Sequence, residues 1–245
     1  MYQYIEQKDY KLTMINNQKF SANSRVLIIG ASGGIGSALA KALSSTYKIN
    51  DIVTFSRSTD NLDITNENSI RSMASTLHGE FDLIFIATGA LEIDGVGPEK
   101  TILSMTPEAL KAQFETNTLG PALLIKHLHT LLPRSRPSVL AVLTARVGSI
   151  SDNNLGGWIS YRTAKAALHQ IIRTSALEIA NKRKQSICVA LHPGTVQTEL
   201  TKKYVGTHPS VSPDEAAQNL LNVVNSLSYE DNGQFFDWSG KQVKW

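Results

Sequence analysis

Short, fully apolar runs alternate with longer amphipathic stretches along the chain from Arg25 onward. Continuous apolar runs that are stopped by glycine or polar residues are typical of buried parallel strands, whereas apolar residues spaced three or four apart indicate helices. The predicted strands cover residues 26–29, 52–56, 82–87, 139–144 and 186–191, and a last strand is expected within 233–245. The predicted helices cover residues 34–44, 67–77, 106–132 with a bend at Gly120-Pro121, 160–181, and a last helix from residue 212.

Regular alternation of strands and helices with short connections predicts a parallel sheet that is covered by helices on both faces. We therefore expect a single α/β domain, a doubly wound sheet of the Rossmann type, over residues 25–245. Residues 1–24 have no clear hydrophobic period, so we expect an N-terminal extension there.

Composition and charge exclude several other classes of protein. The 245 residues are 42% hydrophobic and 18% charged, which is ordinary for a soluble globular domain. A net charge of +3 without a large basic block is too small to predict a nucleic-acid partner, and the longest apolar runs are too short to span a bilayer. The only cysteine, Cys188, lies in an apolar run and is expected to be a buried side chain. Residues 1–11 lack the basic start and apolar stretch of a secretion signal, so we expect a cytoplasmic protein. We expect no bound metal, because His169 and His192 lack ligand spacing.

The turn between the first predicted strand and the first predicted helix is rich in glycine, with the sequence Gly30-Ala31-Ser32-Gly33-Gly34-Ile35-Gly36. A dinucleotide needs a tight turn, a backbone without side chains near the diphosphate, and a helix N-terminus whose free N–H groups attract an anion. In a parallel sheet such a ligand lies at the carboxyl ends of the strands. The residues expected to bind it are Gly30, Ser32, Gly33, Gly34, Ile35 and Gly36.

The end of the second predicted strand indicates which dinucleotide is bound. An acidic residue there would bind a ribose 2′-hydroxyl, whereas an arginine suits a 2′-phosphate. The strand ends with Thr54-Phe55-Ser56-Arg57-Ser58, so a hydroxyl holds the acid position and a guanidinium follows it. Ser56 and Arg57 therefore favour NADP(H) over NAD(H). Asp60 lies close enough in sequence to leave NAD(H) open.

Tyr161 and Lys165 are four residues apart in a predicted helix and therefore share one face of it. A free tyrosine has a pKa of about 10, which is a poor match to neutral pH. We expect the Lys165 ammonium to lower that pKa, so that Tyr161 can give a proton to a carbonyl oxygen or take one from an alcohol. Alone, such residues are more often an ordinary helix pair, but together with the glycine turn they predict carbonyl chemistry.

The chain resembles the short-chain dehydrogenase/reductase family over nearly its whole length from Arg25, because motifs of that family occur here in the family's order. Beyond the glycine turn and the Tyr-x-x-x-Lys pair, these motifs are Leu62-Asp63-Ile64-Thr65, Ala87-Thr88-Gly89-Ala90, Thr116-Asn117-Thr118 and Pro193-Gly194-Thr195-Val196-Gln197-Thr198. The second of them lacks both asparagines of the family's Asn-Asn-Ala-Gly strand end. The resemblance implies that the cofactor also contacts Asp63, Ile64, Ala87, Thr88, Gly89, Tyr161, Lys165, Pro193, Gly194, Val196 and Thr198.

The same resemblance implies that Lys165 holds the nicotinamide ribose and that Asn117 positions Lys165 through a water. The family's catalytic serine follows the strand that ends here at Thr144, but Ala145 stands at that position. A hydroxyl should donate to the substrate oxygen in the transition state. Ser149 is favoured over Thr144 for this catalytic role.

Two further stretches, residues 145–153 and 233–240, look like the C-factor-type branch of the family, whose members are often named as cell–cell signalling proteins. We therefore expect an NADP(H)-dependent oxidoreductase that interconverts a small carbonyl compound and its alcohol. The alternative is a nucleotide-binding regulatory or cell–cell signalling protein with little turnover, which the missing asparagines and Ala145 favour. The long helices at 106–132 and 160–181 resemble those that pair subunits in the family, which predicts a homodimer or homotetramer.

Overall fold

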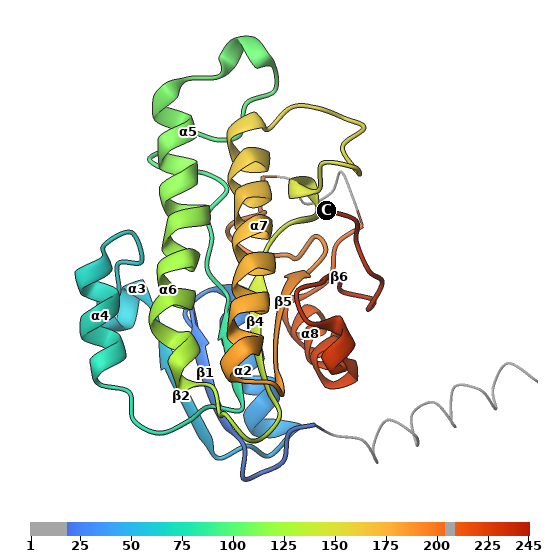
Figure 1. Cartoon of the computed structure of the whole chain (residues 1–245). Coiled ribbons are helices and arrows are strands. Elements are labelled where there is room, and N and C mark those ends of the chain that lie inside the picture. The colour runs from blue at the N-terminus through green and yellow to red at the C-terminus, as the bar shows by residue number, and fades with distance from the viewer. Residues whose placement is uncertain (1–18, 204–208) are drawn as a thin grey trace, which may run out of the picture.

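A six-stranded sheet lies between two layers of helices in the computed structural model, which describes residues 19–203 and 209–245 (Figure 1). The strand order is β2-β1-β3-β4-β5-β6, and all neighbouring strands are parallel. Both observations confirm the predicted doubly wound α/β fold.

The strands and helices follow the predicted alternation closely. The strands are β1 (Arg25–Ile29), β2 (Asp51–Phe55), β3 (Leu83–Ile86), β4 (Ser138–Leu143), β5 (Ser186–His192) and β6 (Phe235–Asp237). The α-helices are α2 (Gly34–Ser45), α3 (Arg57–Asp60), α4 (Glu67–Ser75), α5 (Pro107–Phe114), α6 (Gly120–Leu128), α7 (Ile159–Lys182) and α8 (Pro213–Ser226). Shorter helical turns are η1 (Ile102–Ser104), η2 (Glu115–Leu119), η3 (His129–Leu131), η4 (Arg146–Gly148) and η5 (Tyr229–Asp231).

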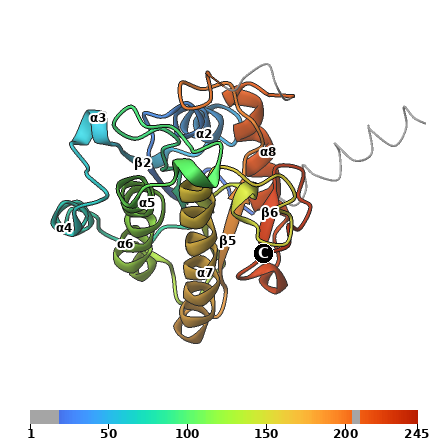
Figure 2. The same ribbon diagram turned by 90° about the horizontal axis from the view of Figure 1, so that it is seen from above.

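The hydrophobic core has two halves, one on each face of the sheet. Helices α2 and α8 cover one face, and α4, α6 and α7 cover the other, as the view from above shows (Figure 2). Successive side chains of a strand point to opposite faces, so Val26 and Ile28 of β1 pack under α2 and α8 while Leu27 and Ile29 face the other helices. Burial on both faces explains why the central strands read as unbroken apolar runs.

The long helix predicted over residues 106–132 is divided into three parts. Helix α5 begins after Thr106, whose side chain caps it by accepting a hydrogen bond from the Ala109 N–H. The chain then forms a π-helical turn, η2, in which the Gly120 N–H donates to the Glu115 carbonyl, and continues as α6. The deviation from a regular helix therefore begins before the predicted Gly120-Pro121 bend, in the turn that contains Asn117.

Two further predictions differ from the structure in extent. The last strand covers only three residues of the predicted 233–245 stretch, and the rest of that stretch is loop with one bridge between Phe236 and Gln242. Residues 1–18 of the predicted extension lie outside the described residues. Phe20, also assigned to that extension, is 1% exposed and belongs to the core on the α2 and α8 face. Its burial shows that the core begins before Arg25.

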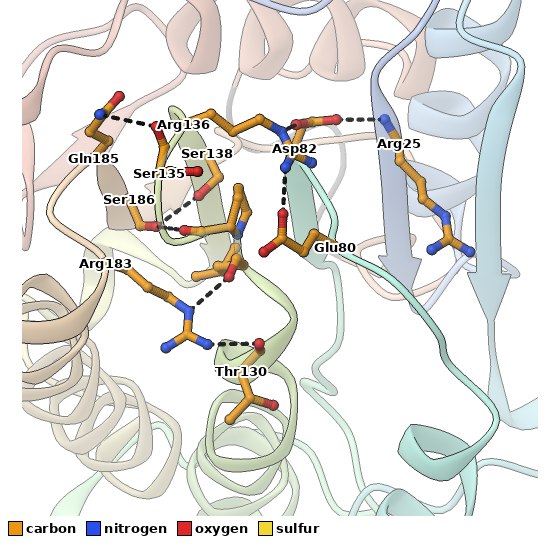
Figure 3. A network of polar contacts seen from close by, with 12 residues as sticks. Arg25, Glu80, Asp82, Thr130, Ser135, Arg136, Ser138, Arg183, Gln185 and Ser186 are labelled. Atoms are coloured by element: carbon orange, nitrogen blue, oxygen red, sulfur yellow. Dashed lines mark hydrogen bonds and ion pairs between the residues drawn. The ribbon is translucent and has the colours of Figure 1, made fainter.

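A network of polar contacts holds the amino ends of the strands, at the opposite end of the sheet from the glycine turn (Figure 3). Asp82 accepts hydrogen bonds from the Arg25 N–H at 2.8 Å and from Arg136 Nε at 2.9 Å. Arg183, at the end of α7, donates to the carbonyls of Leu132 and Thr130, each at 2.8 Å. These contacts join β1, β3 and the loop before β4 to the end of the helix that carries Tyr161 and Lys165.

Within residues 19–203 and 209–245, no helix combines the length and the apolar character that crossing a membrane requires. In the same part of the chain, no group of three or more His, Cys, Asp or Glu residues is arranged to hold a metal ion.

Candidate active site

The predicted site residues that directly follow strands lie at the carboxyl ends of β1, β2, β3, β4 and β5. Strand β1 has β2 on one side and β3 on the other. The chain therefore adds β2 at one edge of β1 and then crosses to the other edge to add β3. This reversal of direction is where parallel sheets bind dinucleotides. The glycine turn follows β1, and Thr88 and Gly89 follow β3. Tyr161 and Lys165 come from the first two turns of α7.

The glycines of the turn are required by close backbone contacts. Gly30 has a φ of +92°, and a Cβ atom there would lie 2.6 Å from the Ala87 carbonyl oxygen at the end of β3. A Cβ on Gly36 would lie 2.2 Å from the Gly30 carbonyl oxygen. Side chains at either position would push helix α2 and strand β3 away from the turn. A Cβ on Gly34 would also meet the Thr198 methyl group at 2.7 Å, which brings the Pro193–Thr198 segment to the same place.

The start of α2 suits an anion. Its N-cap residue is Gly33, so no side chain among the described residues satisfies the first N–H groups, and no acidic residue lies in the first turn. Beside it, the buried Thr88 hydroxyl has no hydrogen-bond partner within the described part of the chain. Unpaired donors and the positive helix end are the features that bind a diphosphate. The residues of this turn therefore fit a dinucleotide.

The end of β2 forms a second polar site, at the one-turn helix α3. Ser56 is buried and caps α3 by accepting a hydrogen bond from the Thr59 N–H at 3.2 Å. The Asp60 carboxylate folds back and accepts the Ser56 N–H at 2.7 Å. Asp60 is therefore held inside this network, which removes the sequence-based argument for a ribose-binding acid. Arg57 is exposed in the first turn of α3.

The Asp63-Ile64 segment lies beside this site. The Asp63 carboxylate accepts hydrogen bonds from the Thr65 hydroxyl at 2.7 Å and the Thr65 N–H at 2.9 Å, and these bonds lower its pKa, with a further contribution from the charge on Arg57. Ile64 packs against Gly120, where a Cβ would lie 2.8 Å from the Ile64 Cδ1 atom. The segment is thus locked onto the start of α6.

Tyr161 and Lys165 lie on one face of α7, as predicted. Lys165 Nζ is 5.7 Å from the centre of the Tyr161 ring, and the two residues are 3% and 9% exposed. Burial lowers the pKa of Lys165 to about 8 and raises the pKa of Tyr161 above its ordinary value. The prediction that the pKa of Tyr161 is lowered was wrong. Loss of water disfavours the charged form of both groups, and for a tyrosine this raises the pKa.

Asn117 and Gly89 complete the surroundings of the lysine. A Cβ on Gly89 would lie 3.0 Å from Asn117 Oδ1 and 3.2 Å from Lys165 Nζ, so only glycine leaves room between these groups. Asn117 is fully buried and makes two hydrogen bonds to the Ala90 backbone, at 2.8 and 3.0 Å. Its amide also donates to Gln113 Oε1 at 2.7 Å. The structure therefore places Asn117, to which the family resemblance gave the role of positioning Lys165, near that lysine.

Gln113 was missed by the sequence analysis. It is buried, accepts from Asn117, and donates to the Leu91 carbonyl at 3.0 Å. It thereby ties Asn117 to the segment that follows β3. A polar residue four positions before Asn117 on the same helix was the available signal.

Both candidate hydroxyls have partners elsewhere in this structure. The Ser149 hydroxyl donates to the Lys244 carbonyl at 2.6 Å, and the Thr144 hydroxyl lies 2.8 Å from His169 Nε2. Ala145 is extended, and its side chain carries no hydrogen-bond donor. The role of Ser149 as donor to a substrate stays a prediction, since the hydroxyl would have to exchange Lys244 for the substrate.

The segment after β5 lines the opposite side of the glycine turn. Gly194 has a φ of +78°, and a Cβ there would lie 2.9 Å from the Trp238 ring, so the segment packs against the chain that follows β6. Val196 is buried and pairs with Val211. Pro193 is partly buried at the end of β5. Thr198 reaches Gly34, as described above.

The C-terminal stretch also contributes to the site, which the sequence pattern did not reveal. The Trp245 ring is stacked on Phe235 and lies 5.2 Å from the His169 ring, measured between ring centres. The Ser151 N–H donates to the Trp245 carbonyl at 3.2 Å. His169 is one helical turn after Lys165, so residues 244 and 245 hold both the loop after β4 and the side of α7 next to the lysine.

Comparison with known proteins places this arrangement in a family. A sequence model described as Enoyl-(Acyl carrier protein) reductase, from the short-chain dehydrogenase/reductases, matches residues 30–226. The chain is 29% identical over 236 residues to 1-hydroxy-2-glutathionyl-2-methyl-3-butene dehydrogenase of Rhodococcus sp. (strain AD45), covering 91% of this chain and 100% of that protein. It is 33% identical over 135 residues to C-signal of Myxococcus xanthus, covering 54% of this chain and 76% of that protein.

Solved structures are similar over nearly the whole chain. An NADPH-bound carbonyl reductase from chicken fatty liver has a TM-score of 0.76 at 23% identity, covering 94% of this chain and 96% of that one. A putative short-chain dehydrogenase/reductase from Burkholderia multivorans with bound NADP has a TM-score of 0.70 at 27% identity, covering 91% of this chain and 100% of that one. With the family match over residues 30–226, these likenesses lead to one conclusion. The chain belongs to the short-chain dehydrogenase/reductase family of oxidoreductases.

Proposed function

We propose that this protein is an NADP(H)-dependent oxidoreductase that interconverts a small carbonyl compound and its alcohol, with Tyr161 as the general acid and base. The observation that carries the proposal is the meeting of Tyr161, Lys165, Asn117 and Gly89 beside the glycine turn. When bound, the nicotinamide supplies or accepts the hydride. The chain must then position the substrate oxygen and move one proton.

Tyr161 is suited to proton donation in the reductive direction. Its raised pKa keeps the phenol protonated at neutral pH, and the oxygen of a carbonyl that is being reduced becomes strongly basic. Burial lowers the pKa of Lys165 to about 8, which is close enough to neutral pH for the ammonium to give up and regain a proton. A lysine at this position can hold the ribose and return a proton to Tyr161, and Asn117, which is tied to the Ala90 backbone and to Gln113, lies on the same side of Gly89 as the lysine.

The substrate oxygen also needs a hydrogen-bond donor other than Tyr161. We assign this role to Ser149 as predicted, in a form where its hydroxyl leaves the Lys244 carbonyl and turns toward the substrate. A hydroxyl can rotate at small cost when one acceptor replaces another.

The choice of cofactor rests on Ser56 and Arg57. The exposed Arg57 guanidinium and the Ser56 and Ser58 hydroxyls lie together at the start of α3, and Asp60 is engaged with the Ser56 N–H. Guanidinium groups bind phosphate through paired, charge-assisted hydrogen bonds. The NADPH-bound and NADP-bound structures of similar proteins support the same choice.

Replacing Arg57 by leucine should weaken NADPH binding and leave NADH binding nearly unchanged. Loss of charge-assisted hydrogen bonds to a phosphate costs about 1.5–3 kcal/mol, which corresponds to a Kd that rises about 10- to 100-fold. Fluorescence titration with both nucleotides measures the effect. Arg71→Leu is the matched control, because Arg71 is exposed and pairs with Glu67 instead. Equal loss of NADPH and NADH affinity in Arg57→Leu would contradict the assignment.

The rival function is nucleotide binding without turnover, as a regulatory or signalling protein. The observations that favour it are Ala145 at the position of the family's serine and the engagement of Ser149 with Lys244. A panel of aldehydes and ketones, assayed by the loss of NADPH absorbance, separates the two. Oxidation of NADPH in the presence of any carbonyl supports the oxidoreductase. Tight NADPH binding without oxidation across the panel would support the rival.

We also propose that the protein is a homodimer or homotetramer. Phe114 at the end of α5 and Leu177 on α7 are large apolar residues that are about half exposed, and the two helices run side by side (Figure 1). A mass of two or four chains is expected by light scattering, and a single-chain mass would refute this proposal.

A further inference from the structure

The helix that carries Tyr161 and Lys165 begins without a cap of its own. Its N-cap residue is Trp158, which has a φ of +55° and makes no side-chain capping bond to the helix within the described residues. No acidic residue lies in the first turn of α7. The free N–H groups and positive end of this 24-residue helix must therefore be satisfied by another part of the chain.

Glu99, which is 61 positions away from Ser160 in sequence, supplies the missing cap. Its carboxylate accepts a hydrogen bond from the Ser160 N–H at 3.2 Å and a second from the Ser160 hydroxyl. Its backbone carbonyl accepts the Trp158 N–H. Glu99 is only 6% exposed. A buried carboxylate that accepts hydrogen bonds at a helix N-terminus acts as a strong cap.

These bonds act on the immediate neighbours of Tyr161. Ser160 precedes Tyr161 in the chain, and the Trp158 ring meets the Tyr161 ring edge-on with 6.2 Å between ring centres. One turn further along α7, the Thr118 hydroxyl donates to the Ala164 carbonyl at 2.7 Å. The second turn thus has its own anchor, and the first turn depends on Glu99.

We propose that Glu99 is a positioning residue for Tyr161, and that its carboxylate sets the place of the phenol by capping the first turn of α7. This inference rests on the proposed function, in which the phenol must reach a substrate oxygen. A displacement of about 1 Å in a reacting group can cost about 100-fold in rate. Loss of the cap should therefore lower turnover more than it changes nucleotide binding, which depends on the glycine turn and on α3.

The test compares Glu99→Ala and Glu99→Gln with a matched control, Glu108→Gln. Glu108 is an exposed carboxylate that lines the same 190 Å³ cavity as Glu99 and Ser160. The measurements are kcat, KM, the Kd of NADPH, and hydrogen exchange of a peptide that spans residues 158–165.

Glu99→Ala should lower kcat by about 10- to 100-fold, accelerate exchange in that peptide, and leave the Kd of NADPH within about twofold. Glu99→Gln keeps one acceptor for the Ser160 N–H, so its kcat should lie between those of Glu99→Ala and the unchanged protein. Glu108→Gln should change neither kcat nor the exchange rate.

Unchanged kcat in Glu99→Ala would overturn the proposal, and so would unchanged exchange in residues 158–165. A loss of kcat that is matched by a loss of NADPH affinity and by faster exchange throughout the protein would also overturn it, because it indicates general destabilisation. If Glu99→Ala does not fold, Glu99→Gln and Ser160→Ala decide by the same criteria. A wild-type protein that reduces no carbonyl would refute the proposed function, while the exchange measurement would still decide whether Glu99 orders the turn that holds Tyr161.

Discussion

Tyr161→Phe is expected to reduce kcat for carbonyl reduction by about 100- to 10,000-fold, the usual contribution of a positioned general acid. The substitution removes one oxygen atom and keeps the ring, so the contacts with Trp158 and Lys165 remain. The Tyr161 phenol is buried and its raised pKa keeps the proton on it, as the proposed role of donor to a developing alkoxide requires. Steady-state kinetics with NADPH and the best substrate of the carbonyl panel measure the effect.

Nucleotide binding separates a chemical defect from a folding defect in this variant. Tyr161→Phe should bind NADPH with a Kd close to that of the wild type, because the glycine turn and Arg57 are untouched. Tyr229→Phe is a suitable control, since Tyr229 is half exposed and lies in η5 beyond β5. Retention of full reductase activity in Tyr161→Phe would exclude the phenol as the proton donor.

Acidification from about pH 7 to about pH 5 should destabilise the protein through two histidines, the buried His169 and the partly buried His192. Burial lowers the pKa of His169 to about 3, with added repulsion from Lys165 and His192, and burial lowers the pKa of His192 to about 4. In the unfolded chain both groups would take up a proton at about pH 6.5. Below that pH the unfolded state binds more protons than the folded state, so the free energy of unfolding falls as pH falls. Each histidine contributes a slope of up to about 1.4 kcal/mol per pH unit.

Chemical denaturation at several pH values in this range measures the slope. The chosen pH range lies above the one in which ordinary carboxylates titrate. His169→Gln keeps a polar partner for the Thr144 hydroxyl and cannot titrate, so it should reduce the slope by about one proton. His78→Gln removes an exposed histidine and serves as the control. A slope that is the same in His169→Gln and in the wild type would show that His169 is not a buried neutral group.

Most of the fold was predictable because it depends on local patterns. The apolar run that forms β1 is buried on both faces. Thr106-Pro107 and Ser212-Pro213 each provide a capping hydroxyl followed by proline, and α5 and α8 begin at these pairs. The glycine turn was also predictable, since Gly30 and Gly36 meet backbone atoms that exclude any side chain. In these cases the signal is a short stretch of sequence, even where the contact itself, as between Gly30 and Ala87, joins distant parts of the chain.

The parts that could not be predicted depend on contacts between distant residues. The π-turn at Glu115–Leu119 places Asn117 against the Ala90 backbone, 27 positions away, and no local preference selects it over a regular helix. The partner of the Ser149 hydroxyl lies 95 positions away, at Lys244. The pKa of Tyr161 was predicted in the wrong direction because pairing with Lys165 is visible in the sequence and burial is not.

The contacts of Lys244 and Trp245 have a consequence for the order in which the enzyme is made. A ribosome synthesises the chain from its amino end, so these two carbonyls emerge after the loop that they hold through Ser149 and Ser151. Five strands of the sheet and the nucleotide turn are complete before β6 and these residues leave the exit tunnel. The loop after β4 can therefore take its final position only after β6 and the residues that follow it have been synthesised.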